Sequence, residues 1–247
     1  MAKQFSSVWT RPQRQPKSAG LGREQIVAAV LELLDAEGLE ALSMRKLGAK
    51  LNSGATSVYW HVANKDELLE LALDEFWGWV ELPEPDESTS WRGVVTTFAY
   101  SLRQTLLDHP WVGTLIGRMP MVGPRAFALS DRLRRTFVNA GFTGLDIYLA
   151  SGTVLSFVFG QVLPEISLNR ATGGEGFDHE AAMAVVGELA ADYPELRADY
   201  ERTMPTDSQA ARIVAYDFGL LCVLDGLQAR LRASESRGNA HRDAENA

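Results

Sequence analysis

Apolar side chains recur along this chain every three or four residues, and no stretch alternates apolar and polar residues as a half-buried strand does. The first such stripe consists of Ile26, Val27, Val30, Leu33 and Leu34. Gly38 follows it, and glycine commonly terminates helices. Apolar residues make up 46% of the 247 positions, which is enough for a core and excludes a wholly disordered chain. The sequence therefore predicts an all-α fold.

The spacing predicts helices over about 23–37, 44–51, 55–61, 64–82, 91–108, 111–118, 124–141, 144–168, 179–191 and 207–232. Pro164 lies inside one of them, so we expect a kink or a break there. Residues 194–200 are expected to be irregular, and the polar residues 235–247 to be disordered.

The predicted organisation is a flexible basic arm (1–20), an N-terminal head (21–82), a helical body (90–234) and a disordered tail (235–247). Residues 81–90, ELPEPDESTS, are acidic and contain proline, as is typical of a linker. The net charge of −8 is unevenly spread: residues 1–65 hold nine basic and five acidic residues, and residues 66–247 hold 15 and 27. The basic balance of residues 1–65, ahead of an acidic remainder of the chain, indicates two separate tasks.

Several classes of protein are excluded by the sequence. Cys222 is the only cysteine, which rules out a disulfide framework and a cysteine-based zinc site. A single cysteine fits a reducing cytoplasm, so we expect a cytoplasmic protein. The N-terminus has no apolar run of signal-peptide length, and no stretch approaches 18 uninterrupted apolar residues, so we expect no membrane span. The sequence has no HExxH, GxSxG, Walker A or GxGxxG motif, so we expect no enzyme, no metal and no cofactor. His109 is interpreted as a helix-end histidine bonded by local carbonyls, in preference to a metal ligand.

The stretch of residues 43–65, SMRKLGAKLNSGATSVYWHVANK, carries the functional prediction, with a motif at about 43–62. Ser43 is a suitable N-cap, the Asn52–Gly54 turn separates two short helices, and Asn64 caps the next helix. Two helices joined by a tight turn form a helix-turn-helix, whose second helix enters the major groove of DNA. Apart from Ala55, which lies at the start of the second helix, the candidate DNA-binding residues offer hydroxyls, rings or positive charge. They are Arg45, Lys46, Ala55, Thr56, Ser57, Tyr59, Trp60, His61 and Lys65.

Residues 21–80 resemble the N-terminal domain of the TetR family of bacterial transcriptional regulators, through LGREQIVAAVLELLDAEGLEALSMRKLGAKL, SVYWHV and NKDELL. The resemblance implies a recognition helix at 55–61, a base contact from Arg45 and a phosphate contact from Lys65. Asn52 stands where the family usually has glycine. Because Ala55 cannot make the hydrogen bonds of a glutamine, the base preference must differ from that of a tetracycline operator.

The body resembles the tetracycline-repressor-type C-terminal domain, through Trp91, LLDHPW, GPRA and NAGF. This resemblance implies a homodimer joined by a four-helix bundle, with a stripe for partner contact made of Leu220, Leu221, Leu224, Leu227 and Leu231. It also implies an effector pocket, for which the candidate lining residues are Trp91, Phe98, Leu102, Trp111, Ile116, Met119, Phe137, Tyr148, Leu155 and Phe159. Ile116 and Ser156 stand where metal-binding pocket histidines of tetracycline repressors are expected, which argues against a tetracycline–metal ligand.

We therefore expect a ligand-responsive transcriptional regulator, a repressor that a small lipophilic effector releases from a palindromic operator on double-stranded DNA. The alternative is an effector-binding or interaction protein on the same fold, with a head that no longer binds DNA. Arg45, Tyr59 and Lys65 speak against that alternative, and so does His61. An enzyme is a third hypothesis, without any visible nucleophile–base pair.

Overall fold

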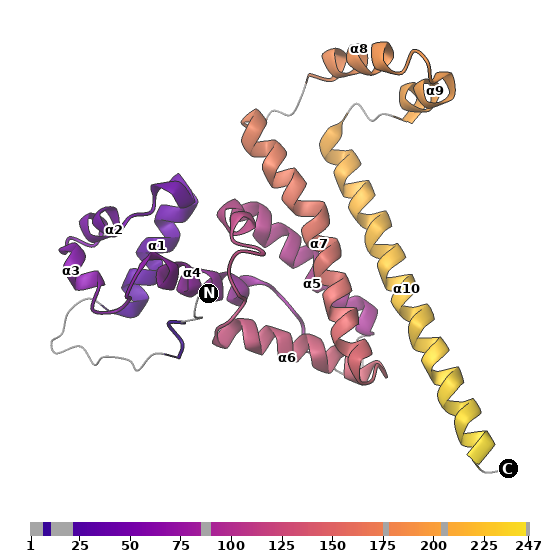
Figure 1. Cartoon of the computed structure of the whole chain (residues 1–247), viewed down its shortest axis with the longest axis horizontal. Coiled ribbons are helices and arrows are strands. Elements are labelled where there is room, and N and C mark those ends of the chain that lie inside the picture. Colours follow the sequence, from indigo (N-terminus) through magenta and orange to yellow (C-terminus); the bar gives the residue numbers. More distant parts are fainter. Residues whose placement is uncertain (1–6, 11–21, 85–89, 175–177, 204–206, 246–247) are drawn as a thin grey trace, which may run out of the picture. The chain divides into compact units, whose positions relative to one another are not determined.

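The computed structural model of the chain describes residues 7–10, 22–84, 90–174, 178–203 and 207–245, and those residues contain helices and no strand. The all-α prediction is therefore confirmed for this part of the chain. The chain divides into two compact units, residues 1–151 and 152–247 (Figure 1). The predicted linker at 81–90 lies inside the first unit, in which helices of the head pack against two later segments, residues 124–139 and 110–114.

The head consists of α1 (Arg23–Glu37), a 3-10 turn η1 (Leu39–Ala41), α2 (Met44–Lys50), α3 (Ala55–Val58) and α4 (Lys65–Trp79). The predicted signals are present: Gly38 ends α1 with a φ of 77°, and its N–H donates to the Leu34 carbonyl. Ser43 accepts from the Lys46 N–H at 3.2 Å, and Asn64 accepts from the Glu67 N–H at 2.9 Å. These helix boundaries are fixed by local hydrogen bonds, which explains why the sequence predicts them.

The first unit continues with α5 (Trp91–Asp108), the 3-10 helix η2 (Pro110–Thr114) and α6 (Pro124–Asn139). The segment expected to be a helix at 111–118 is therefore a shorter 3-10 helix. α4 packs against α6, and α1 packs against both α4 and η2. Phe98, Leu102 and Trp111 are fully buried in this unit.

The remaining helices are α7 (Leu145–Thr172), α8 (His179–Leu189), α9 (Pro194–Thr203) and α10 (Ser208–Glu245). In the second unit α7 and α10 lie side by side, with the rings of Phe157 and Tyr216 5.1 Å apart (Figure 1). A Cβ on Gly219 would lie 2.6 Å from the Phe157 ring, so this glycine permits the close approach of the two helices.

Two predictions about these helices are wrong, and a third is wrong in part. α7 is not broken at Pro164, because one lost backbone hydrogen bond does not end a helix of 28 residues with a buried apolar stripe; the kink stays a prediction. Residues 194–203 form α9, which Pro194 starts in the first turn where proline is favoured. The polar tail is helical as far as Glu245, since polar residues without a proline can extend a helix.

The predicted flexible arm also requires correction. Ser7 and Val8 are buried, and the turn that they begin packs against α4. Residues 1–6 and 11–20 of the arm lie outside the described residues.

Candidate functional site

The α2–turn–α3 segment forms a helix-turn-helix on the head. The turn is closed by the Ser53 N–H, which donates to the Gly48 carbonyl at 2.9 Å. Asn52 has a φ of 49°, a left-handed conformation that asparagine tolerates and that a glycine could also adopt. Leu47 and Val58 are fully buried beneath the motif, and α3 packs against α2. α3 covers residues 55–58, one turn shorter than the predicted 55–61.

The exposed side chains of the motif include those best suited to touch DNA. Arg45 and Thr56 are exposed, Tyr59 is 49% exposed and Trp60 is 63% exposed. Exposed tyrosine and tryptophan side chains are enriched at surfaces that bind a partner. Ser57 and His61 are partly buried. The side chain of Ala55 lies outside the part of the chain that the structure describes.

Two of the candidate cations have partners within the head. Lys46 forms an ion pair with Glu37 of α1, and Lys65 donates to the Leu39 carbonyl at 3.0 Å. The neighbouring Lys50 pairs with Glu32 at 2.7 Å. α1 thus balances the charge of two α2 lysines, whereas the guanidinium of Arg45 stays exposed. Lys65 keeps two further N–H donors for a phosphate.

Two carboxylates, the buried Asp74 and the exposed Asp35, join the head to the rest of the first unit. Asp74 of α4 accepts from the N–H groups of Arg125 and Ala126, each at 3.0 Å to Oδ1, and so caps the start of α6. Asp35 of α1 accepts from the Trp111 indole N–H at 2.7 Å, and its Oδ1 lies 2.7 Å from His109 Nδ1. The interpretation of His109 as bonded by local carbonyls is therefore wrong, because its partner lies 74 residues away.

Sequence reasoning missed the buried acids of α4. Glu67, Glu70 and Asp74 are all buried, because α4 buries every residue from 67 to 74 and is covered on all sides there. The leucines and the alanine between these acids, in the run ELLELALD, are the signal that could have identified them. Buried acids need hydrogen-bond partners.

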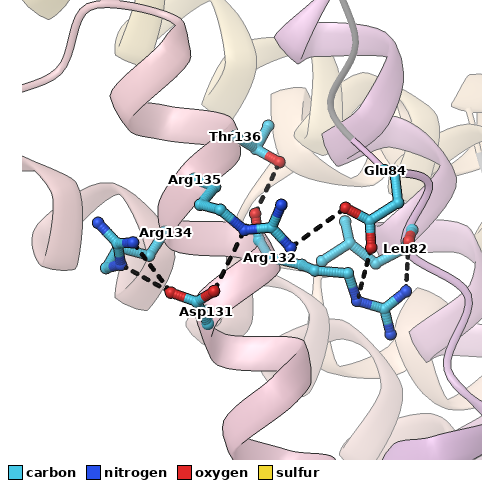
Figure 2. A network of polar contacts seen from close by, with 7 residues as sticks. All are labelled: Leu82, Glu84, Asp131, Arg132, Arg134, Arg135 and Thr136. Atoms are coloured by element: carbon cyan, nitrogen blue, oxygen red, sulfur yellow. Dashed lines mark hydrogen bonds and ion pairs between the residues drawn. The ribbon is translucent and has the colours of Figure 1, made fainter.

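Arginines of α6 hold the chain just after the head (Figure 2). Arg132 donates to the Leu82 carbonyl at 3.1 Å, and Arg135 pairs with Glu84 at 3.1 Å. The guanidinium of Arg134, which donates to Asp131 at 3.0 Å, holds the pKa of that carboxyl below its usual value, and Arg135 adds to the effect. Residues that follow α4 are therefore fixed on the body helix rather than free.

The candidate pocket residues fall into both units. In the first, the rings of Trp91 and Phe137 lie 6.0 Å apart and both contact Phe142, which sequence reasoning missed. Phe98, Leu102 and Trp111 are buried, and Ile116 and Met119 are partly buried. Tyr148 is exposed, and the partly buried Leu155 and Phe159 belong to the second unit. The effector pocket stays a prediction.

The predicted interface stripe on α10 is oriented inward for the most part. Its buried members are Leu220, Leu224, Leu227 and Leu231, whereas Leu221 is 53% exposed. A heptad spacing of leucines thus serves packing within one chain, and Leu221 is the member of the stripe that faces solvent. Other exposed apolar side chains on α10 are Ile213, Val214 and Phe218, and α7 exposes Leu145, Tyr148 and Leu149.

Comparison with known proteins identifies the family. The family model described as bacterial regulatory proteins, tetR family, matches residues 26–72, and the model of the tetracyclin repressor-like C-terminal domain matches residues 82–231. The chain belongs to the TetR family. The fold, with its N-terminal helix-turn-helix and helical C-terminal domain, is confirmed by these matches. TetR-family regulators bind DNA and small-molecule effectors and dimerise.

Several relatives are similar over most of their length. An HTH-type transcriptional regulator of Saccharopolyspora erythraea is 40% identical over 195 residues, 78% of this chain and 81% of that protein. The transcriptional repressor DrrR1 of Streptomyces coeruleorubidus is 29% identical over 219 residues, 88% of this chain and 81% of the relative. The crystal structure of ActR of Streptomyces coelicolor with actinorhodin is 29% identical, covers 86% of this chain and 99% of its own, and has a TM-score of 0.75. The chain is thus a TetR-family transcriptional regulator, a family of DNA-binding proteins and not of enzymes.

Proposed function

We propose that this regulator is a homodimeric repressor that places α3 of each protomer in successive major grooves of a palindromic operator. The observation that carries this proposal is the helix-turn-helix, whose exposed Arg45, Thr56, Tyr59 and Trp60 project from the positively charged N-terminal part of an otherwise acidic chain. A guanidinium, a hydroxyl and two rings can contact phosphates, base edges and thymine methyls. The basic residues 11–20, which carry Arg11, Arg14 and Lys17, are proposed to add phosphate contacts.

A second copy of the chain is the proposed partner for the uncovered apolar faces of α7 and α10. α7 is long and apolar enough to span a membrane, and only a small share of its most apolar stretch is buried. We propose that this exposed stretch packs in a helical bundle between two protomers. Tyr148 and Leu149 on α7, and Phe218 and Leu221 on α10, are exposed at helical spacing. We propose that the protein acts in the cytoplasm, on the nucleoid.

The effector is proposed to be a lipophilic, planar aromatic molecule. Two observations support this: the ring cluster of Trp91, Phe137 and Phe142 in the body, and the similarity to ActR, a structure of which contains actinorhodin. Asp35 and Asp74 provide the connection from the body to α1 and α4. An effector that binds one arrangement of the body better than the other lowers operator affinity by that difference, typically ~1–3 kcal/mol.

Selection of bound sequences from random duplex DNA tests the function. The expected product is a palindrome whose half-sites are about one helical turn apart. Titration of that duplex should show a log–log salt slope of about −7, if each of two heads neutralises about four phosphates. Tyr59→Ala should weaken binding about tenfold or more, whereas Tyr193→Ala, another exposed tyrosine outside the motif, should not. Selection that recovers no common sequence, together with a flat salt dependence, would contradict the proposal.

A further inference from the structure

The N-terminal segment Ser7–Thr10 forms a turn that is fastened to α4. Ser7 is 2% exposed and Val8 is 4% exposed. The Ser7 hydroxyl donates to Glu70 Oε2 at 2.7 Å, and the Val8 N–H donates to the same oxygen at 3.0 Å. Within the turn, the Trp9 N–H donates to Ser7 Oγ at 3.2 Å and the Thr10 N–H donates to the Ser7 carbonyl at 3.2 Å. A buried carboxylate on α4 is thus satisfied by a segment more than 60 residues away in sequence.

The same turn reaches the first residue of α1. The guanidinium carbon of Arg23 lies 4.8 Å from the centroid of the Trp9 ring, within the range of a cation–π interaction. Val8 contributes a buried apolar side chain to the same region of the head. Ser7–Thr10 therefore contacts both α4, through Glu70, and α1, through Arg23.

This position matters because of the order in which the helices of the head pack. α3 packs against α2, α2 against α1, and α1 against α4, which in turn packs against α6. The orientation of α3 relative to α6 therefore depends on the α1–α4 pair. Glu70 lies one turn before Asp74, so the N-terminal turn and the start of α6 hold adjacent turns of α4.

We propose that Ser7–Thr10 is a clasp that fixes α1 against α4, and that Ser7, Trp9 and Glu70 are positioning residues for operator recognition, an inference that rests on the function proposed above. In this proposal the clasp residues act through the head helices and do not contact DNA themselves. It narrows the range of angles at which α3 is presented, so that both heads of a dimer meet their half-sites together. Affinity for the correct sequence depends on that alignment, whereas sequence-independent binding depends on charge.

The test uses pairs of variants that have the same net charge, of which one loses or weakens the clasp and the other keeps it. Deletion of residues 2–10 removes the clasp, and deletion of residues 2–6 keeps it; both remove the same charged residue, Lys3. Glu70→Gln weakens the clasp, and its control, Glu75→Gln, removes one negative charge from the same helix at a surface ion pair with Arg125. Each variant is titrated with the duplex recovered by the selection above and with a non-operator duplex of equal length.

Loss of the clasp should weaken operator binding roughly fivefold to thirtyfold and leave non-operator binding within about twofold. The 2–6 deletion and Glu75→Gln should bind the operator like the full chain. Hydrogen exchange should show slow exchange of the Val8 amide in the full chain and faster exchange in Glu70→Gln, because an amide oxygen accepts less strongly than a carboxylate. The amides of α2 and α3 should stay protected in both. Equal operator binding by the full chain and the 2–10 deletion, or fast exchange at Val8 in the full chain, would overturn the clasp and leave the proposed function intact.

An unpaired buried carboxylate can itself destabilise the head, so a second variant separates stability from positioning. The 2–10 deletion combined with Glu70→Leu removes the carboxylate together with its partners. We expect the melting temperature to recover in this double variant while the ratio of operator to non-operator affinity stays low. Recovery of that ratio would show that the clasp acts through stability alone and would overturn the positioning role. Failure of the full chain to prefer any sequence would instead contradict the proposed function.

Discussion

Asp74 offers the sharpest test of how the head is held to the body. Its carboxylate is 3% exposed and accepts the N–H groups of Arg125 and Ala126, so a residue of α4 caps the start of α6. Gly123 precedes that start with a φ of 143°, and a Cβ there would lie 2.2 Å from Asp74 Oδ1. The glycine thus permits an approach that any other residue would block.

The magnitude follows from the two N–H groups that Asp74→Ala would leave unpaired. Loss of a helix cap costs about 1 kcal/mol, and a buried donor without a partner costs about 1–3 kcal/mol. Because these terms overlap, we expect Asp74→Ala to lower the free energy of unfolding by about 2–4 kcal/mol. Asp74→Asn keeps an acceptor but loses the negative charge at the N-terminus of α6, which should lower the free energy of unfolding by about 0.3–1 kcal/mol. Asp108→Ala, at an exposed acid of α5, should change stability by about 0.5 kcal/mol or less.

Thermal and urea unfolding followed by circular dichroism measure these differences. For a chain of this size, Asp74→Ala should lower Tm by roughly 5–15 °C. Gly123→Ala should be destabilising in the full chain and less so in the Asp74→Ala background, where the carboxylate is gone. A cost below about 0.5 kcal/mol for Asp74→Ala, or an equal effect of Gly123→Ala in both backgrounds, would refute the reasoning.

Three further predictions concern other contacts. Trp111→Phe removes only the indole donor to Asp35 and should lower the free energy of unfolding by about 1–2 kcal/mol; a double-mutant cycle with Asp35→Ala should show coupling, and additive effects would contradict the bond. Arg45→Ala should weaken operator binding by about 1–3 kcal/mol in an anisotropy titration, more than Lys50→Ala, whose amine is already paired with an acid; the reverse order would count against the proposed interface. The depressed pKa of Asp131 implies a stabilising contribution that is present above the unfolded pKa and disappears as pH falls through the lower folded value. The difference in Tm between the full chain and Asp131→Asn should therefore vanish in that acid range, and also in about 0.5 M salt because the pair is exposed; a difference that persists in acid would refute the ion-pair cause.

Much of the helix-turn-helix could be predicted from the sequence because its signals are local. Ser43 and Asn64 bond to N–H groups three residues away, and the Asn52 turn needs only a residue that tolerates a positive φ. The hydrogen-bond partner of a side chain, or the face of a helix that is buried, is harder to predict when it depends on residues far away in sequence. His109 binds a carboxylate 74 residues away, and the leucines of α10 are oriented by the helix that packs on them, which periodicity does not identify.

The sequence by itself determined the helical class, the caps and turn of the DNA-binding motif and the family, because periodic apolar residues and short-range hydrogen bonds are written in neighbouring positions. Only the tertiary structure decided what the acids of α4 do. Glu70 and Asp74 lie in a stretch of α4 that is buried on all sides, and they would be costly to bury alone. The N-terminal turn and the start of α6 bring N–H and O–H donors to them, and such donors, more than 50 residues away, are known only once the chain has folded.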